Sequence, residues 1–242
     1  MLFRSFTGIL HDLTERTELE GRLREQTALA RLGEMAAVIA HEIKNPLAAV
    51  RGAIQVIGGR LPAGSKDVPV VKEIVARLDA LNDLIKDLLL FARTPQPRMA
   101  SVGLLPLLQM TVDLLSKDPL FAGVHVVVTG DAPPIPGDAE LLKIIVQNLL
   151  INAAQALQGH GTITVRIVPG ASVHEIQVAD TGPGIAPDVR EKLFRPFFTT
   201  KARGTGLGLS IARRLTEAQG GTIGVTCPRE GGTQVTVALP AR

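Results

Sequence analysis

Residues 33–50 read GEMAAVIAHEIKNPLAAV, and the rest of the chain is organised around this stretch. Its pattern is helical, and small or apolar residues lead into it in alternating steps of four and three, the spacing of a heptad seam. The seam residues are Leu19, Leu23, Gln26, Ala30, Gly33, Ala37 and Ala40. His41 falls one position off this seam, or about 100° around the helix. Its ring is therefore predicted to face solvent or a partner and not the core.

The neighbours of His41 suggest chemistry. Glu42 is adjacent, and Asn45 lies four residues on, so that it shares a helix face with His41. Pro46 removes a backbone donor and predicts a kink about one turn later. Taken alone, His41 is better explained as an ordinary exposed helix residue than as a reacting group. An exposed histidine with an acid, an amide and a kink beside it is typical of a reacting group.

Beyond Ala40 the seam takes a step of three where four was due, which predicts local overwinding, and then continues from Ile43 to Leu61. A turn rich in glycine and proline follows, and a second helical seam runs from Val71 to Ala92. We expect residues 19–93 to form an antiparallel helical hairpin. One hairpin leaves its seam half exposed, so a second copy is predicted to complete a four-helix bundle.

Two prolines in TPQPR, residues 94–98, predict a linker over residues 94–101. Beyond it, residues 102–242 alternate between segments with the periodicity of a helix and segments with that of a strand. Helices are predicted at 102–116, 138–157 and 207–218, and strands at 124–129, 162–168, 173–179, 222–226 and 233–239. Consecutive strands with few helices between them indicate an α+β domain, in which a mixed or antiparallel sheet has helices on one face.

Composition narrows the class of protein. The chain has 242 residues, 45% of them hydrophobic, and a net charge of only +3 without a Lys/Arg stripe, which gives no support for a nucleic-acid partner. The single Cys227 cannot form an internal disulfide and fits a reducing compartment. No apolar run reaches the roughly 18 residues of a membrane span. These features predict a cytoplasmic protein.

Four clusters in the second domain suggest a nucleotide site. Asn148 and Asn152 are four apart on an apolar helix, and two amides on one face could complete the coordination of Mg²⁺, although helix-surface amides are common. Asp180, with Gly182 and Gly184 after it, follows a strand. Its carboxylate could accept a hydrogen bond from an exocyclic amine, and the glycines would let a ligand approach the backbone. By itself this pattern would equally fit a tight turn.

The other two clusters are loops. The run Gly204, Thr205, Gly206, Leu207 and Gly208 opens a helix, whose N–H groups suit phosphate oxygens. It is neither a Walker A loop nor a Rossmann fingerprint. The stretch FRPFFTTK, from Phe194 to Lys201, holds three of the seven phenylalanines. It is interpreted as a nucleotide lid or a contact surface, with simple packing under the loop as the alternative.

In this order and spacing, the four clusters resemble the N, G1, F and G2 boxes of the ATP-binding domain shared by histidine kinases, type II topoisomerases, mismatch-repair ATPases and the heat-shock ninety chaperone. The run HEIKNPL, which begins at His41, resembles the phosphoacceptor box of sensor histidine kinases of two-component systems. Together the matches span roughly residues 19–239, and HEIKNPL and PFFTTK are most similar to the nitrogen-regulation type. The first residues, 1–18, resemble the exit of a PAS-like sensor domain, or form a plain arm with Asp12 or Thr14 as a helix cap.

The resemblance implies a Bergerat-type sandwich that binds ATP and Mg²⁺ in a homodimeric protein histidine kinase. It implies that His41 accepts the γ-phosphoryl group, that Glu42 assists, and that the group passes to the receiver domain of a response regulator. It also implies that Asn45 serves a phosphatase activity, and that an upstream sensor domain belongs to the full-length protein. One departure is Gln155, where many members carry a basic residue, so that Lys201 or Arg203 is expected to supply this charge. An ATP-driven clamp and a non-enzymatic scaffold are the alternatives.

Overall fold

The computed structural model describes residues 42–62, 64–201, 204–228 and 231–241. The chain divides into two compact units, residues 1–93 and residues 94–242. His41, the seam of residues 19–40 and the sensor-like residues 1–18 lie outside the described residues, so the expectations placed on them stay predictions. None of the described helices is long and apolar enough to cross a membrane.

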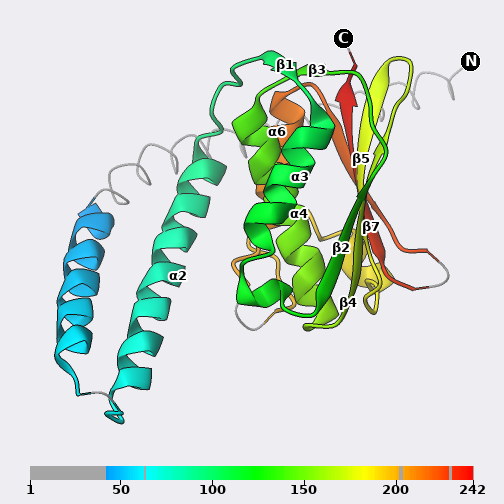
Figure 1. Ribbon diagram of the computed structural model, residues 1–242. Coiled ribbons are helices and arrows are strands. Elements are labelled where there is room, and N and C mark those ends of the chain that lie inside the picture. Colours follow the sequence, from blue (N-terminus) through cyan, green and yellow to red (C-terminus); the bar gives the residue numbers. More distant parts are fainter. Residues whose placement is uncertain (1–41, 63, 202–203, 229–230, 242) are drawn as a thin grey trace, which may run out of the picture. The chain divides into compact units, whose positions relative to one another are not determined.

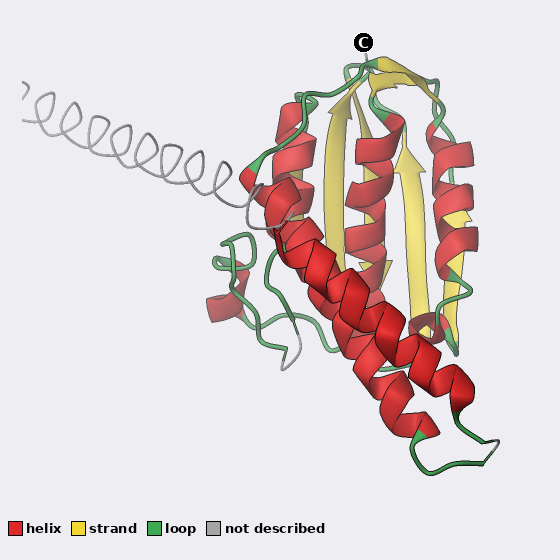
Figure 2. Ribbon diagram, turned by 90° about the vertical axis from the view of Figure 1, so that its left-hand side faces the viewer, coloured by secondary structure: helices red, strands yellow, loops and turns green. Residues whose placement is uncertain are grey.

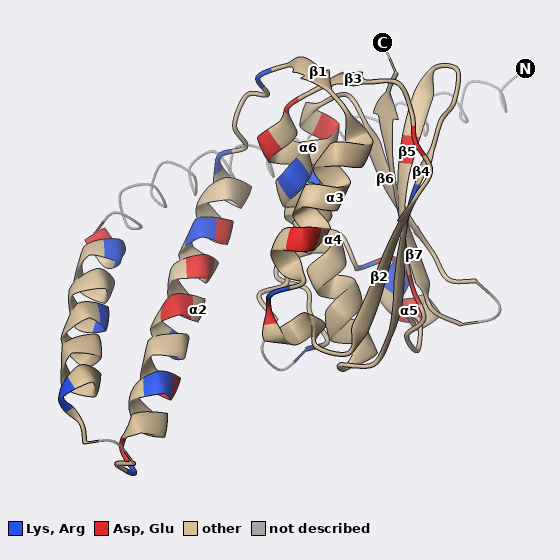
Figure 3. Cartoon of the chain, in the orientation of Figure 1, with Lys and Arg blue, Asp and Glu red and all other residues tan. Residues whose placement is uncertain are grey.

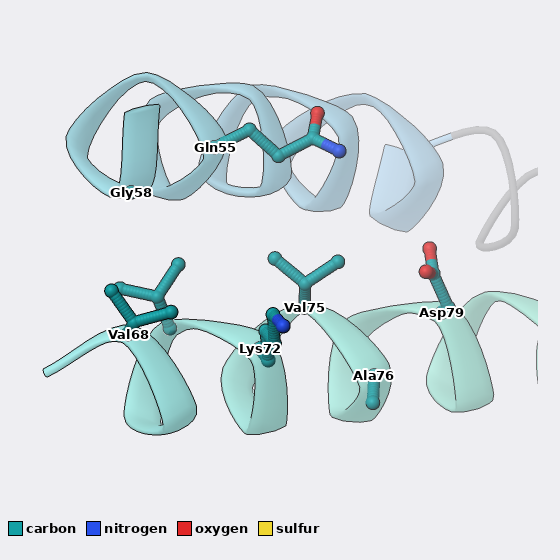
Figure 4. A pocket seen from close by; sticks show the side chains of 8 residues that line it. Gln55, Gly58, Val68, Lys72, Val75, Ala76 and Asp79 are labelled. Atoms are coloured by element: carbon teal, nitrogen blue, oxygen red, sulfur yellow. The ribbon is translucent and has the colours of Figure 1, made fainter. Parts of the chain in front are cut away.

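The first unit contains the helix of residues 42–60 and α2 (Val68–Ala92), which lie side by side as a hairpin (Figure 1). They approach closely at their connected ends, since a Cβ on Gly58 would lie 2.7 Å from Val71. Farther along, Arg51 Nε donates to Asp79 Oδ1 at 2.7 Å and joins the two helices. Figure 4 shows Val75 and Asp79 directed from α2 toward the other helix. The predicted hairpin is therefore confirmed over its described residues.

The seam of this hairpin stays largely open to solvent in the single chain. Ile57 is 52% exposed and Leu81 43%, although both are seam positions. Charged residues of both signs are interspersed along α2, whereas the other helix has Glu42 at its start and only basic charged residues beyond it (Figure 3). The helix continues without interruption through Pro46, and the bend expected there stays a prediction. The half-exposed seam that the sequence predicts for one hairpin is present.

The second unit is built on a five-stranded mixed sheet in the order β2-β4-β5-β7-β6. β2 and β4 pair in parallel, and all the other pairs are antiparallel. The strands are β2 (Val124–Thr129), β4 (Gly161–Val168), β5 (Val173–Asp180), β6 (Thr222–Thr226) and β7 (Thr233–Pro240). The α+β class and the mixed sheet expected from the sequence are confirmed.

Three helices cover one face of this sheet: α3 (Leu104–Leu115), α4 (Ala139–Leu157) and α6 (Gly208–Ala218) (Figure 2). α4 is the central element, because it contacts both other helices and the sheet. Ile145 and Leu150 of α4 are fully buried, as are Ile163 and Ile176 of the sheet. Asp138 caps α4, since its Oδ1 accepts from the backbone N–H groups of Glu140 and Leu141 at 3.0 and 3.1 Å. The apolar contact of these buried α4 side chains with those of the sheet holds α4 in place.

Several short elements were not predicted. The last residues of the expected linker, Ala100 and Ser101, instead belong to β1 (Ala100–Val102), which pairs with β3 (Ile135–Gly137). A 3₁₀ turn, η1 (Pro119–Phe121), and the short helix α5 (Pro187–Arg190) were also missed. Such elements are too short to show a periodic pattern, and long-range pairing stabilises β1 and β3. Asp180 is the last residue of β5 and not the first residue beyond it.

Candidate nucleotide site

The two amides of α4 lie against the first residue of α6. A Cβ on Gly208 would lie 2.7 Å from Asn148 Oδ1 and 3.6 Å from Asn152 Nδ2, so only glycine allows α6 to begin there without a shift. Asn148 Nδ2 donates to the carbonyl of Ile144 at 2.9 Å, which leaves Asn148 Oδ1 to accept from, or coordinate, another group. The structure thus brings the amide cluster and the glycine run that opens α6 together.

Asp180 ends β5 with a carboxylate that is already partly hydrogen-bonded. Its Oδ1 accepts from Gly182 N at 2.8 Å, and the backbone and hydroxyl of Thr233 on β7 also hydrogen-bond to it. Desolvation by burial raises the pKa of Asp180, and these hydrogen bonds oppose the rise without cancelling it. Asp180 is therefore a half-buried acceptor with capacity left for a ligand donor.

Thr233 was missed by the sequence analysis. It is buried and pairs in register with Asp180 across β5 and β7. The available signal was the pair of glycines, Gly231 and Gly232, directly before a strand. Gly232 has a φ of +81°, and a Cβ there would lie 2.1 Å from the carbonyl oxygen of Asp180.

The predicted glycines after Asp180 form a close turn. A Cβ on Gly182 would lie 2.8 Å from Asp180 Oδ1, and Gly184 has a φ of +77°. Side chains would both strain this backbone and fill the space beside the carboxylate. These contacts make the glycines part of the turn that presents Asp180.

The glycine run before α6 contacts the phenylalanine loop through backbone atoms. Gly206 has a φ of +68°, and a Cβ there would lie 2.5 Å from the carbonyl carbon of Phe197. Thr205 Oγ1 accepts from Leu207 N at 3.2 Å, and the Leu207 side chain is buried in the core, so Leu207 can meet a ligand only through its backbone. Gly204 also lies against this loop, at Thr199.

The phenylalanine loop is anchored at both ends. Near its start, the guanidinium of Arg213 on α6 lies over the Phe194 ring, 5.9 Å from the centroid. Phe194, expected to contact nucleotide, thus has a packing contact with α6. At the other end, Lys201 Nζ donates to Asn152 Oδ1 at 2.9 Å and to Gln155 Oε1. Arg203, the other candidate cation, lies outside the described residues.

Desolvation lowers the pKa of Lys201. Beside this ammonium a cavity of about 430 Å³ opens, lined by Pro119, Leu120, Ala154, Gln155, Gln158, Gly159, Lys201 and Gly204. Lys201 is only partly desolvated and its side chain remains exposed, so its charge can meet an anionic group in this open space.

The ligand set limits the kind of metal that this site could hold. Within the described part of the chain, no three His, Cys, Asp or Glu side chains gather as a metal cluster. Asn148 Oδ1 and Asn152 Oδ1 offer two neutral oxygens. Mg²⁺ commonly takes one or two protein ligands and completes its shell with water and nucleotide phosphates. The residues present fit Mg²⁺ bound together with a nucleotide.

The predicted phosphoacceptor region is described only in part. Glu42 and Asn45 are exposed on the helix of residues 42–60. The geometry of these residues relative to His41 lies outside the described residues, as does the imidazole itself.

Two family models match the chain. Residues 31–97 match the His Kinase A (phospho-acceptor) domain, and residues 137–242 match the histidine kinase-, DNA gyrase B- and HSP90-like ATPase. The sensor histidine kinase ZraS of Escherichia coli K12 is 34% identical over 98% of this chain and 51% of its own length. The signal transduction histidine-protein kinase AtoS of the same strain is 36% identical over 96% of this chain and 38% of its own.

Solved structures agree with the fold. The full-length ShkA structure in complex with AMPPNP matches with a TM-score of 0.74 and 28% identity, over 86% of this chain and 46% of ShkA. The histidine kinase ThkA in complex with the response regulator protein TrrA matches with a TM-score of 0.62 and 25% identity, over 90% of this chain and 64% of the matched one. The chain spans about half the length, or less, of the curated relatives described above.

Proposed function

The chain belongs to the sensor histidine kinases of two-component systems, and from this premise we propose that it uses Mg·ATP to phosphorylate His41 and passes the phosphoryl group to an aspartate of a response regulator. The nitrogen-regulation type is part of the proposal. The observation that best supports the kinase function is that Asn148, Asn152 and Lys201 lie together with the glycine run at the start of α6. His41, which directly precedes the described helix of residues 42–60 in the sequence, supplies the acceptor.

In this proposal, each cluster of the second unit has a role in binding. The Asp180 carboxylate accepts from the exocyclic amine of adenine, in the space that Gly182 and Gly184 leave open. Asn148 and Asn152 would hold Mg²⁺, which would neutralise charge on the phosphates. Lys201 and the backbone N–H groups of residues 204–208 bind phosphate oxygens. Phosphoryl transfer needs mainly such positioning and charge neutralisation.

The transfer step uses the neutral imidazole of His41. One ring nitrogen forms a bond to the γ-phosphorus while the bond from that phosphorus to the β,γ-bridging oxygen breaks and ADP leaves. Glu42 accepts or orients the proton on the other ring nitrogen, which makes the attacking nitrogen more nucleophilic. The phosphorus–nitrogen bond then breaks as a regulator carboxylate oxygen attacks.

Two further parts of the proposal concern the hairpin. Its exposed seam supports a homodimer, in which a second copy covers residues such as Ile57 and Leu81. Asn45 has both donor and acceptor capacity, and we assign to it the orientation of a water against the phosphoaspartate of the regulator. Asn45→Ala should then slow dephosphorylation of the regulator while leaving labelling of His41 largely intact.

The test is incubation with γ-labelled ATP, followed by acid and alkali treatment of the protein. We expect a label that is labile in acid and stable in alkali, and that is absent from His41→Gln although this variant still binds ATP. Release of phosphate without label on the protein would favour an ATP-driven clamp instead. Retention of an acid-labile label in His41→Gln would exclude His41 as the acceptor.

A further inference from the structure

The tip of Lys201 is held by two neutral oxygens of one helix. Its ammonium donates to Asn152 Oδ1 at 2.9 Å and to Gln155 Oε1, and both acceptors stand on α4, three residues apart. Within the part of the chain that the structure describes, no ion pair joins Lys201 to a carboxylate. The positive charge of Lys201 is therefore oriented by amide oxygens and not neutralised by them.

The two acceptors differ in what a nucleotide would require of them. Asn152 Oδ1 is the oxygen that the proposed function assigns to Mg²⁺, and a divalent cation and an ammonium repel each other on one oxygen. Gln155 lies one turn closer to the end of α4, where it lines the cavity beside Lys201. Were Asn152 Oδ1 to coordinate the metal, the bond to Gln155 would be the one of these two bonds that still holds Lys201.

We infer that Gln155 is a positioning residue for Lys201. In the nucleotide-free chain, Gln155 and Asn152 together hold the phenylalanine loop over α4. On binding of Mg·ATP, Lys201 loses its hydrogen bond to Asn152 and retains the one to Gln155. Its remaining N–H groups then donate to phosphate oxygens. This inference rests on the proposed function, because it assumes that the metal takes Asn152.

A purely structural role for the same contact is the alternative to exclude. α4 has no basic residue in its last turn, so Lys201 also places a cation near the negative end of the helix dipole. That role predicts that losing Gln155 lowers the stability of α4 and has no specific effect on Lys201. The two roles differ in whether the effects of changing Gln155 and Lys201 depend on each other.

The first experiment is limited digestion of the nucleotide-free protein by trypsin, with cleavage after Lys201 followed by mass spectrometry. Gln155→Met removes the acceptor at nearly constant volume and should speed this cleavage about tenfold, because it removes a hydrogen bond to a charged group. Gln158→Met is the matched control: Gln158 lines the same cavity without bonding Lys201, so this variant should cleave like the parent. Gln155→Glu keeps an acceptor and should cleave no faster than the parent.

The second experiment measures Mg·ATP affinity by calorimetry in a His41→Gln background, which prevents labelling. Gln155→Met and Lys201→Met should each weaken binding about tenfold, and the double variant should bind no more weakly than Lys201→Met. Fully additive losses, or unchanged trypsin cleavage in Gln155→Met, would overturn the inference. The trypsin measurement needs no nucleotide, so it tests the hydrogen bond between Gln155 and Lys201 even if the kinase proposal fails.

Discussion

The two units of the chain differ in how they bury apolar surface. α4 in the nucleotide unit has nine buried residues among 19, whereas α2 in the hairpin has three among 25: Ile85, Phe91 and Ala92. The nucleotide unit buries its apolar residues within a single chain. The hairpin leaves its seam uncovered in the single chain, and the proposed second copy would cover it. The nucleotide unit should thus be stable alone, whereas the unit with the proposed acceptor should depend on association.

The largest effect should follow from a cavity in the nucleotide unit. Ile145→Ala removes a fully buried side chain of α4 and should lower the free energy of unfolding of this unit by about 2–5 kcal/mol. Urea unfolding followed by circular dichroism measures this loss, which should not depend on protein concentration. Ile144→Ala, on a half-buried position of the same helix, should cost less. Equal losses at the two positions would remove the distinction between a buried and a half-buried face of α4.

The next effect concerns ligand binding, which should be separable from association. Asp180→Asn lets an amide donor face the donor of adenine and should weaken Mg·ATP binding by about 1–3 kcal/mol. Calorimetry measures this affinity, and sedimentation measures the dimer, which should be unchanged. An unaltered affinity would remove Asp180 from the site.

A smaller effect should distinguish the hairpin. Ile57→Ala should weaken the dimer by about 1 kcal/mol per protomer, because Ile57 is half exposed in one chain and becomes covered in two. The matched control is Val56→Ala: Val56 is 55% exposed but lies one position off the seam. Analytical ultracentrifugation should show weaker association for the first variant only. Equal behaviour of the two variants would argue against the seam as the dimer interface.

The smallest effect should come from the ion pair between Arg51 and Asp79, which joins the two helices of the hairpin. Asp79→Asn removes the charge that faces Arg51, and both side chains are nearly half exposed, so the loss should be about 0.2–1 kcal/mol and should shrink further in high salt. Thermal unfolding at low and high salt measures this change. A loss of stability that does not depend on the salt concentration would mean that packing, and not charge, dominates the contact.

The sequence predicted the regular elements well because their periodic patterns are local. The valine-rich run of residues 124–129 predicted β2 at its observed bounds, and the sequence also predicted that the helix α4 begins at Asp138. What the sequence could not show were partners distant along the chain. Thr233 reaches Asp180 only through the pairing of β5 with β7. Lys201 reaches Gln155 only because its loop folds back over α4, 46 residues away in sequence.

The place of β7 in the sheet has a consequence for synthesis. Among the described strands β7 comes latest in the sequence, yet it lies between β5 and β6 and pairs with both. While the ribosome is still making residues 233–240, β5 has an open edge and Asp180 lacks its Thr233 partner. The nucleotide unit can therefore complete its sheet only after residue 240 has been made, and loss of the eight residues of β7 would remove an inner strand.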